Sequence, residues 1–289
     1  MQPDQVGALA EELQLDGSGT PVEVRAGRGL AELWRLPRRT AADVLLRIFP
    51  AGSPSAHAER EAAAQRLAIA HGVGAPAVLR CAVIAGCPVL AMEWVDAPTV
   101  STMLLGGSDP QHVGRQCGRQ LAMLHEITDA AVVDSPTILE RNWIDWAGAR
   151  ADRLRAPIRS TADLADRRLL HLDFHPDNLL LDGDDVVVLD WANTRIGPRS
   201  ADLARSASIL QLIEHHPDLG DLGRSVIAGY RSGFSVGYQE VTGLDPDTAT
   251  PRAVQAWAAA VALQDLVGAD WVPDAVLDQF ERCYRDGLD

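Results

Sequence analysis

Residues 171–178 read His171-Leu172-Asp173-Phe174-His175-Pro176-Asp177-Asn178, and a short hairpin after them ends at Asp190 and Trp191. Their polar residues have the form H-x-D-x-x-x-x-N, and Asp190 follows residues 186–189, which are four apolar residues in a row. Such an apolar run is typical of a strand that is covered on both faces. A carboxylate at the end of a buried strand costs free energy unless a partner stabilises it. Asp190 is therefore a candidate functional residue.

The spacing of these carboxylates and the amide indicates phosphoryl transfer. In that chemistry one carboxylate orients the acceptor hydroxyl and takes its proton, while a second carboxylate and an amide oxygen hold Mg²⁺ on the nucleotide phosphates. Asp173, Asp190 and Asn178 fit these roles in that order. The alternative is a hairpin with Asp173 and Asn178 as helix caps, and we adopt a plain turn role only for residues 182–185. The sequence therefore predicts Asp173 as catalytic base, and Asn178 and Asp190 as ligands of Mg²⁺.

Composition narrows the class of protein. The chain has 289 residues, of which 47% are apolar and 23% charged, as in a soluble globular protein with room for two packed lobes. Its 26 basic residues face 40 acidic ones, a formal net charge of −14. This balance argues against a nucleic-acid partner, which would need a basic surface. It favours a cationic small molecule instead.

Two residue types exclude further classes. All 26 basic residues are arginine, so a Walker A P-loop, a pyridoxal phosphate aldimine and a Schiff-base aldolase are excluded, because each needs a lysine. The four cysteines have no C-x-x-C spacing, so we expect reduced thiols and no zinc site. Residues 1–15 lack the features of a signal peptide, and no apolar stretch is long enough to cross a bilayer. We expect a cytoplasmic protein with no membrane partner.

The hydrophobic pattern changes along the chain. Its first third alternates like strands, with one helical segment, and the rest is mainly helical apart from a β-rich island. We expect strands at 22–26, 30–36, 44–49, 77–84 and 88–95, and helices at 57–71, 111–127, 143–154, 201–216, 225–238, 252–268 and 274–284. This order predicts an α+β fold of two lobes. Residues 1–95 would form a nucleotide-binding lobe, and residues 96–289 a catalytic and substrate-binding lobe.

The catalytic stretch resembles the core of the aminoglycoside phosphotransferase and choline kinase family, which are small-molecule kinases with a protein-kinase-like fold. The family's loop commonly reads H-G-D-x-H-x-x-N, followed by I-D-W or I-D-F; here Leu172 and Asp177 stand where glycines are usual. Its later G-D-P-x-x-D-L-A motif resembles residues 197–204, so Asp202 matches a residue that braces the catalytic loop. The resemblance covers roughly residues 20–210 and implies a protein-kinase-like two-lobed fold.

The resemblance also implies how phosphates are held. Kinases of this fold place a lysine on the third strand, and a glutamate on the next helix orients it. This chain has Arg47 at the strand position and Glu61 on the helix. Arg47 would replace the lysine, because a guanidinium grips phosphate through two nitrogens. An edge-strand charge at Arg47 and Glu59 as the partner are the alternatives.

Further contacts with ATP or GTP follow from the resemblance. The loop Gly27-Arg28-Gly29 would cover the phosphates, although a plain hairpin explains it nearly as well. Backbone groups of Glu93 and Val95, in the link between the lobes, would bond the edge of the adenine base. His171 would support the catalytic loop by hydrogen bonding.

The acceptor site should lie in the last third of the chain. Residues 201–289 hold 14 acidic residues and 6 arginines, and an acidic cleft would attract a polyamine or aminoglycoside. The candidate cleft residues are Glu214, Asp265, Asp270 and Trp271, although solvated helix faces explain most single charges. Four tryptophans are candidates to cover an acceptor ring or cation, or to pack in the core: Trp143, Trp146, Trp257 and Trp271.

These observations lead to one expected function and its alternatives. We expect a kinase that transfers the γ-phosphate of ATP or GTP to a hydroxyl of an aminoglycoside-like antibiotic or related metabolite. A sugar, an amino alcohol or another antibiotic are alternative acceptors. A catalytically silent nucleotide-binding protein is the other class; the missing lysine favours it, whereas the intact Asp173, Asn178 and Asp190 set argues against it. A protein kinase is disfavoured, because only twelve positions separate Asp190 from Asp202.

Overall fold

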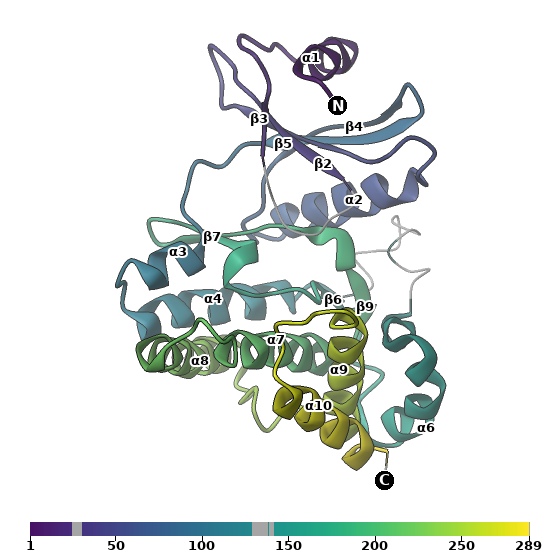
Figure 1. Cartoon of the computed structure of the whole chain (residues 1–289), viewed down its shortest axis with the longest axis vertical. Coiled ribbons are helices and arrows are strands. Elements are labelled where there is room, and N and C mark those ends of the chain that lie inside the picture. The colour runs from purple at the N-terminus through teal and green to yellow at the C-terminus, as the bar shows by residue number, and fades with distance from the viewer. Residues whose placement is uncertain (25–30, 129–137, 139–141, 289) are drawn as a thin grey trace.

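The structure is a computed structural model that describes residues 1–24, 31–128, 138 and 142–288. Gly27, Arg28 and Gly29 lie outside the described residues. The N-terminal part is an antiparallel five-stranded sheet in the order β1-β2-β3-β5-β4 (Figure 1). Its strands are β1 Val22–Glu23, β2 Glu32–Leu36, β3 Val44–Ile48, β4 Val78–Ile84 and β5 Cys87–Glu93, and its helices are α1 Pro3–Glu12 and α2 Ala56–Ala70.

The two faces of this sheet are covered by different helices, because alternate residues of β3 point to opposite sides. Val44, Leu46 and Ile48 are buried against α1. Leu45 packs on the other side with the residues of α2, and Arg47 follows it on that face. The strand period therefore places the Arg47 side chain toward α2, the helix that carries Glu61.

The rest of the chain is mainly helical (Figure 1). It contains two small sheets, β6 with β9 and β7 with β8. The helices are α3 Val100–Leu105, α4 Pro110–Leu124, α6 Ala151–Thr161, α7 Arg199–Glu214, α8 Asp221–Thr242, α9 Arg252–Asp265 and α10 Asp274–Asp286. The strands are β6 Arg168–Leu170, β7 Leu179–Asp182, β8 Asp185–Val188 and β9 Arg195–Gly197. No described helix is both long and apolar enough to cross a membrane.

Helix α2 joins the two parts. Ala58 and Ala62 pack under the five-stranded sheet, whereas Ala64 and Ala68 belong to the core that contains α4, β7 and β8. Just after α2, the carbonyl oxygen of Gly74 accepts a hydrogen bond of 2.9 Å from the backbone of Val188. A Cβ on Gly74 would overlap the carbonyl oxygen of Val186, so the two backbones approach as closely as glycine allows. The division at residues 95 and 96 stays a prediction.

Most of the expected elements are present, and their ends differ by a few residues. The predicted helix at 143–154 is instead a 3-10 helix, Trp143–Arg150, followed by α6. Gly148 lies between them with φ of 57° and ψ of −131°, where an added Cβ would overlap the side chain of Gln264. The helical pattern of the sequence continues through this break. Helix α3 was not expected, because six residues are too few for a clear period.

Helices α4 and α8 pack backbone to backbone. An added Cβ on Gly118 of α4 would overlap the carbonyl oxygen of Phe234 in α8. The same overlap with backbone of the facing helix occurs at three more glycines: Gly114, Gly233 and Gly237. Helix α4 ends next to His125, which contacts the Asp202 carboxylate of α7. The close packing of α4 on α8 therefore fixes the position of His125.

Replacing Gly118 with alanine should destabilise the protein. The new methyl group forces two backbones apart, and such overpacking costs typically about 1–3 kcal/mol. Urea unfolding measures the change. Gly7→Ala in α1 is the matched control, because nothing lies within 4 Å of its added Cβ; it should stabilise the helix by about 0.5–1 kcal/mol. Equal effects of the two substitutions would contradict the close packing.

Candidate active site

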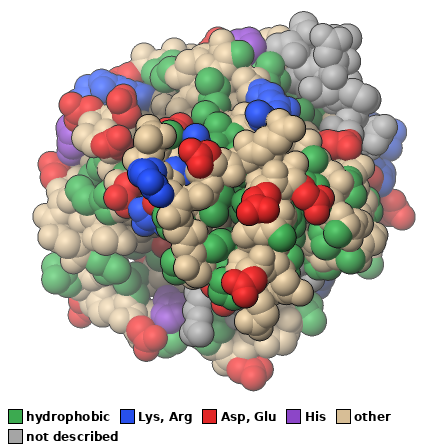
Figure 2. Space-filling model, turned by 90° about the horizontal axis from the view of Figure 1, so that it is seen from above, with side chains coloured by type: hydrophobic (Ala, Val, Ile, Leu, Met, Phe, Trp, Pro, Cys, Tyr) green, Lys and Arg blue, Asp and Glu red, His purple; other side chains and the backbone are tan. Residues whose placement is uncertain are grey.

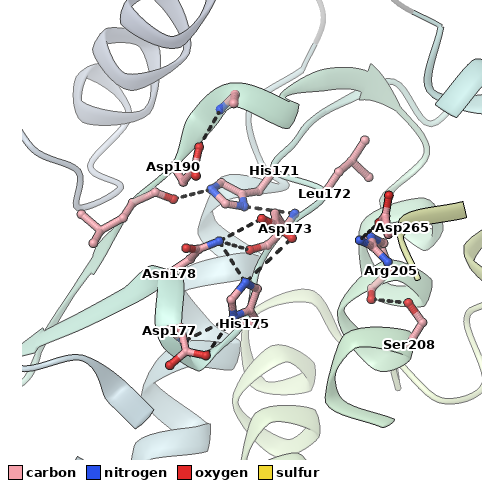
Figure 3. Close-up of polar contacts among 12 residues, drawn as sticks. His171, Leu172, Asp173, His175, Asp177, Asn178, Asp190, Arg205, Ser208 and Asp265 are labelled. Atoms are coloured by element: carbon pink, nitrogen blue, oxygen red, sulfur yellow. Dashed lines mark hydrogen bonds and ion pairs between the residues drawn. The ribbon is translucent and has the colours of Figure 1, made fainter. Parts of the chain in front are cut away.

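The catalytic loop begins at the end of β6 with His171, whose side chain is fully buried. Its Nε2 donates to the carbonyl oxygen of Leu189, 2.8 Å away, and its Nδ1 accepts from the backbone N–H of Asp173 at 3.3 Å. The ring therefore joins the loop that carries Asp173 to the end of the strand before Asp190. Figure 3 shows His171 between these two aspartates.

A second buried side chain, that of Asp202, binds the backbone of the same loop. The Asp202 carboxylate in α7 accepts from the backbone N–H groups of His171 and Leu172, at 2.7 and 2.8 Å. His125 Nε2 lies 3.2 Å from the same carboxylate. Burial raises the pKa of Asp202, but the hydrogen bonds and the neighbouring histidines outweigh burial and lower it. Asp202 therefore stays ionised and contacts the loop backbone, as the family resemblance implies.

Leu172 has a backbone conformation that explains why glycine is usual at this position. Its φ is 64°, in the left-handed region that costs an L residue roughly 1–2 kcal/mol. Its side chain is fully buried in the core that also contains Trp257 and Ala201. Burial of a leucine is worth about 1.5–3 kcal/mol, so packing offsets the backbone strain. The Asp202 hydrogen bond to the Leu172 N–H holds the strained conformation.

Asn178 is oriented by the loop itself. Its amide nitrogen lies 3.0 Å from both the carbonyl oxygen and the Oδ2 of Asp173, and 3.0 Å from His175 Nε2 (Figure 3). The amide oxygen has no hydrogen-bond partner among the described residues. Burial lowers the pKa of His175, which favours the neutral ring that can accept from the amide. The nitrogen is thus used within the protein, and the oxygen is left for a cation.

Arg47 bridges two carboxylates from different parts of the chain. Its Nε lies 3.4 Å from Glu61 Oε2, and its Nη1 donates to Asp190 Oδ1 at 3.1 Å. The guanidinium also lies over the ring of Phe49, 5.6 Å from the centroid. Burial lowers the pKa of Arg47, but Glu61 and Asp190 outweigh burial and raise it. Glu61 is the partner of Arg47, whereas Glu59 is exposed on the same helix.

Burial strongly changes the pKa of the Glu61 carboxyl. Its side chain is only 3% exposed. Burial raises its pKa to about 7, although Arg47 opposes the rise; Asp190 adds to it. The carboxyl is therefore poised to change its protonation near neutral pH when nothing else is bound.

The link after β5 contains Glu93 and Val95, whose backbone groups we expect to bond the adenine base. Only one of these two residues has an N–H without a partner among the described residues. The Glu93 N–H already donates to the Ala77 carbonyl oxygen at 2.9 Å. The backbone N–H and carbonyl of Val95 make no hydrogen bond with the described residues. Val95 N–H is thus available to a base edge, whereas Glu93 has only its carbonyl to offer.

The predicted acceptor residues are spread over the C-terminal helices. Asp265, the last residue of α9, pairs with Arg205 at 2.5 Å. Glu214 pairs with Arg231 at 3.3 Å, and the Trp271 ring lies 4.9 Å from that of His216. Among the described residues, no hydrogen bond, ion pair or ring contact joins Glu214, Asp270 or Trp271 to the catalytic loop.

Two of the four tryptophans are core residues. Trp143 and Trp257 are buried with ring centroids 4.7 Å apart. Trp146 is only partly buried and packs against Arg205, a residue that the sequence analysis missed. Arg205 follows Asp202 by three positions on α7, so the helical period places both on neighbouring positions of one face. That spacing was the available signal.

A cavity of about 250 Å³ lies elsewhere, between α7, α8, α9 and α10. None of the predicted site residues lines it. It is therefore separate from the catalytic loop.

The strain at Leu172 predicts an order of stabilities. Leu172→Gly and Leu172→Ala both lose the buried side chain, but only glycine relieves the positive φ. We expect the glycine variant to be about 1 kcal/mol more stable than the alanine variant, with the wild type above both. Urea unfolding of the three proteins measures the order. An alanine variant as stable as the glycine variant would exclude the left-handed conformation.

Glu61 predicts a pH dependence of folding. Its folded pKa of about 7 exceeds the ordinary 4.5, so the folded chain holds this proton more tightly than the unfolded chain. The stabilisation is complete below the ordinary pKa and is lost as pH rises through the folded pKa. Between about pH 5 and 8, the wild type should lose on the order of 2 kcal/mol of unfolding free energy from this group.

Glu61→Gln should remove this loss, and urea unfolding at several pH values without nucleotide or metal measures it. Glu59→Gln on the exposed side of α2 is the control and should keep the wild-type profile. If Glu61→Gln showed the wild-type pH profile, another group would be responsible.

The sequence profile described as the phosphotransferase enzyme family matches residues 34–244. No curated protein sequence matches the chain. An amicoumacin kinase, solved with AMP-PNP, Ca²⁺ and amicoumacin, is similar in fold with a TM-score of 0.71 and 14% identity, over 99% of this chain and 93% of that one.

Two other solved structures show the same fold at low identity. A choline/ethanolamine kinase family protein from Mesorhizobium loti has a TM-score of 0.59 and 18% identity, over 100% of this chain and 98% of that one. A macrolide 2'-phosphotransferase of type I has a TM-score of 0.56 and 18% identity, over 96% and 94% of the two chains. The family match covers well over half of the chain. The chain therefore belongs to the phosphotransferase enzyme family of aminoglycoside phosphotransferases and choline kinases, and it has their protein-kinase-like, two-lobed α+β fold.

Proposed function

We propose that this phosphotransferase is a Mg²⁺-dependent small-molecule kinase. It transfers the γ-phosphate of ATP or GTP to a hydroxyl of an aminoglycoside-like antibiotic or a related metabolite. The observation that carries the proposal is a series of contacts: Arg47 pairs with Asp190, and His171 bonds both the carbonyl of Leu189, the residue before Asp190, and the N–H of Asp173. Asp173 in turn accepts from Asn178. These contacts support a role for Asp173 as base, for Asp190 and Asn178 as oxygen ligands, and for Arg47 as the phosphate-binding cation.

Asp173 is the residue that would act on the acceptor. Its side chain is 23% exposed, and its contacts with Asn178 and His175 leave it without a strong cationic partner among the described residues. It can therefore orient the acceptor hydroxyl and take its proton as the new bond to phosphorus forms.

The donor set fits Mg²⁺, because carboxylate and amide oxygens are hard ligands. Asn178 would offer its amide oxygen, and Asp190 its carboxylate, of which one oxygen already accepts from Arg47. The bound metal would neutralise charge on the nucleotide phosphates. Arg47 would leave Asp190 to grip phosphate, while Glu61 keeps the guanidinium in place. Gly27, Arg28 and Gly29 are proposed to cover the phosphates, and Glu93 and Val95 to contact the base.

A catalytically silent nucleotide-binding protein is the second candidate. The observation that favours it is the Arg47–Asp190 pair, because a carboxylate held by arginine must be released before it can ligate a metal. Nucleotide binding without consumption of nucleotide, for any acceptor, would support this candidate.

Asp173→Asn tests the proposed base. The substitution keeps the shape of the side chain but removes its ability to take a proton. Acceptor phosphorylation should fall by about 10²–10⁴-fold, while nucleotide affinity stays close to that of the wild type. Steady-state kinetics and calorimetry measure the two quantities. Unchanged turnover would remove Asp173 from the base role.

The acceptor itself is found by label transfer. Purified protein, Mg²⁺ and γ-labelled ATP or GTP are incubated with aminoglycosides, other antibiotics, sugars and amino alcohols, with Asp173→Asn as the control. Label on a small molecule that depends on Asp173 supports the proposal. Label on no small molecule, with nucleotide bound but not consumed, supports the silent alternative.

A further inference from the structure

We propose that the ion pair between Arg205 and Asp265, packed on Trp146 beside the catalytic loop, selects the acceptor. It favours a hydroxylated acceptor with one amino group or none over a polycation. This inference rests on the proposed kinase function. Among the acceptors that the function leaves open, it favours the related metabolites over typical aminoglycosides, which are polycations.

The pair is built from two helices that the fold brings together. Arg205 lies in α7, one turn after Asp202, and Asp265 ends α9. Arg205 Nη2 donates to Asp265 Oδ2 at 2.5 Å. The Arg205 guanidinium also lies over the Trp146 ring, 5.1 Å from its centroid. These contacts fix the direction of the pair.

The Asp265 carboxylate lies within electrostatic range of the proposed base, Asp173. Burial raises the pKa of Asp265, and the nearby Asp173 carboxylate raises it further, against the opposing effect of Arg205. Figure 3 shows Arg205 and Asp265 on the opposite side of Asp173 from Asn178. An acceptor whose hydroxyl binds Asp173 would therefore extend toward Asp265. The nucleotide phosphates would lie on the other side of Asp173, near Asn178.

The two partners differ in exposure. The Asp265 side chain is 38% exposed, and that of Arg205 only 7%. The acceptor would thus meet a carboxylate that has a guanidinium directly behind it. Such a carboxylate accepts a hydrogen bond from a hydroxyl or a single ammonium group. The net charge of the pair is zero, so it adds little long-range attraction for a molecule with several positive charges.

The stability of the fold does not explain why an arginine occupies position 205. A buried ion pair is often no more stabilising than apolar residues of similar volume. Moreover, Arg205 Nε and Nη1 are buried and have no hydrogen-bond partner among the described residues, which costs free energy. A role beside Asp173 accounts for a charged group at this position.

The other candidate acids do not restore a strongly acidic cleft. Glu214 is paired with Arg231, and Asp270 is exposed with no contact to the catalytic loop among the described residues. Figure 2 shows the other end of the molecule, on the side of the five-stranded sheet, where acidic and basic side chains are also interspersed. Two of the three candidate acids, Glu214 and Asp265, are therefore neutralised by an arginine.

The test compares acceptors that differ only in charge. The full chain with Mg²⁺ and ATP or GTP is given hydroxylated cyclitols and aminocyclitols with no, one or three or more amino groups. The wild type should have its highest kcat/KM for the first two classes. Arg205→Met, which keeps the apolar length against Trp146, should shift the ratio toward the polycation by about tenfold. The shift should lie in the acceptor KM, with the nucleotide KM unchanged.

Arg150→Met is the matched control, because Arg150 also pairs with a carboxylate, Glu281 at 2.6 Å, and lies over the Tyr284 ring. It should keep the wild-type ratio. Asp265→Asn is the second variant, for the case that Arg205→Met does not fold. It leaves Arg205 unpaired and should lower kcat/KM for every amine acceptor more than for the neutral one.

Binding separates this inference from the proposed function. Calorimetry with a non-hydrolysable nucleotide gives acceptor affinities without turnover, and the same ratios are expected in Kd. Nucleotide that is never consumed would overturn the proposed function, while these affinities still decide the inference. A wild-type preference for the polycation, or ratios that Arg205→Met and Asp265→Asn leave unchanged, would overturn the inference alone.

Discussion

The buried carboxylate of Asp202 is the constraint on which the site depends. It accepts two backbone hydrogen bonds from the catalytic loop, and together with the burial of the Leu172 side chain they hold this residue at a positive φ. That conformation directs Asp173 and Asn178 to the same side of the loop. A group without solvent contact thus determines where the proposed chemistry takes place.

A guanidinium in place of an ammonium changes the electrostatics around it. Arg47 contacts Glu61 and Asp190 at once, because its planar fork offers donors in two directions. The two carboxylates come from α2 and from the end of the β7–β8 hairpin, so a single side chain couples both lobes. The all-arginine composition is therefore compatible with the phosphate-binding role without requiring the same geometry as a lysine.

The sequence predicted the parts of the fold that local pattern determines. The catalytic stretch, the strand with Arg47 and the helix with Glu61 all follow from period and spacing, and the structure has them within a few residues. Pairings across long separations carry no local signal. Arg205 and Asp265 are 60 positions apart, so the sequence showed an unpaired acid where the structure has an ion pair. The break at Gly148 lies against the side chain of Gln264, which is even further away in the chain.

The hydrogen bond from Val188 to the Gly74 carbonyl lies where α2 leaves the N-terminal lobe and meets the strand before Asp190. Both atoms belong to the main chain, so only a proline at position 188, which has no N–H, would delete the bond directly. The junction between the two lobes therefore needs a glycine at position 74 and a donor at position 188, and it is independent of the other side chains around it.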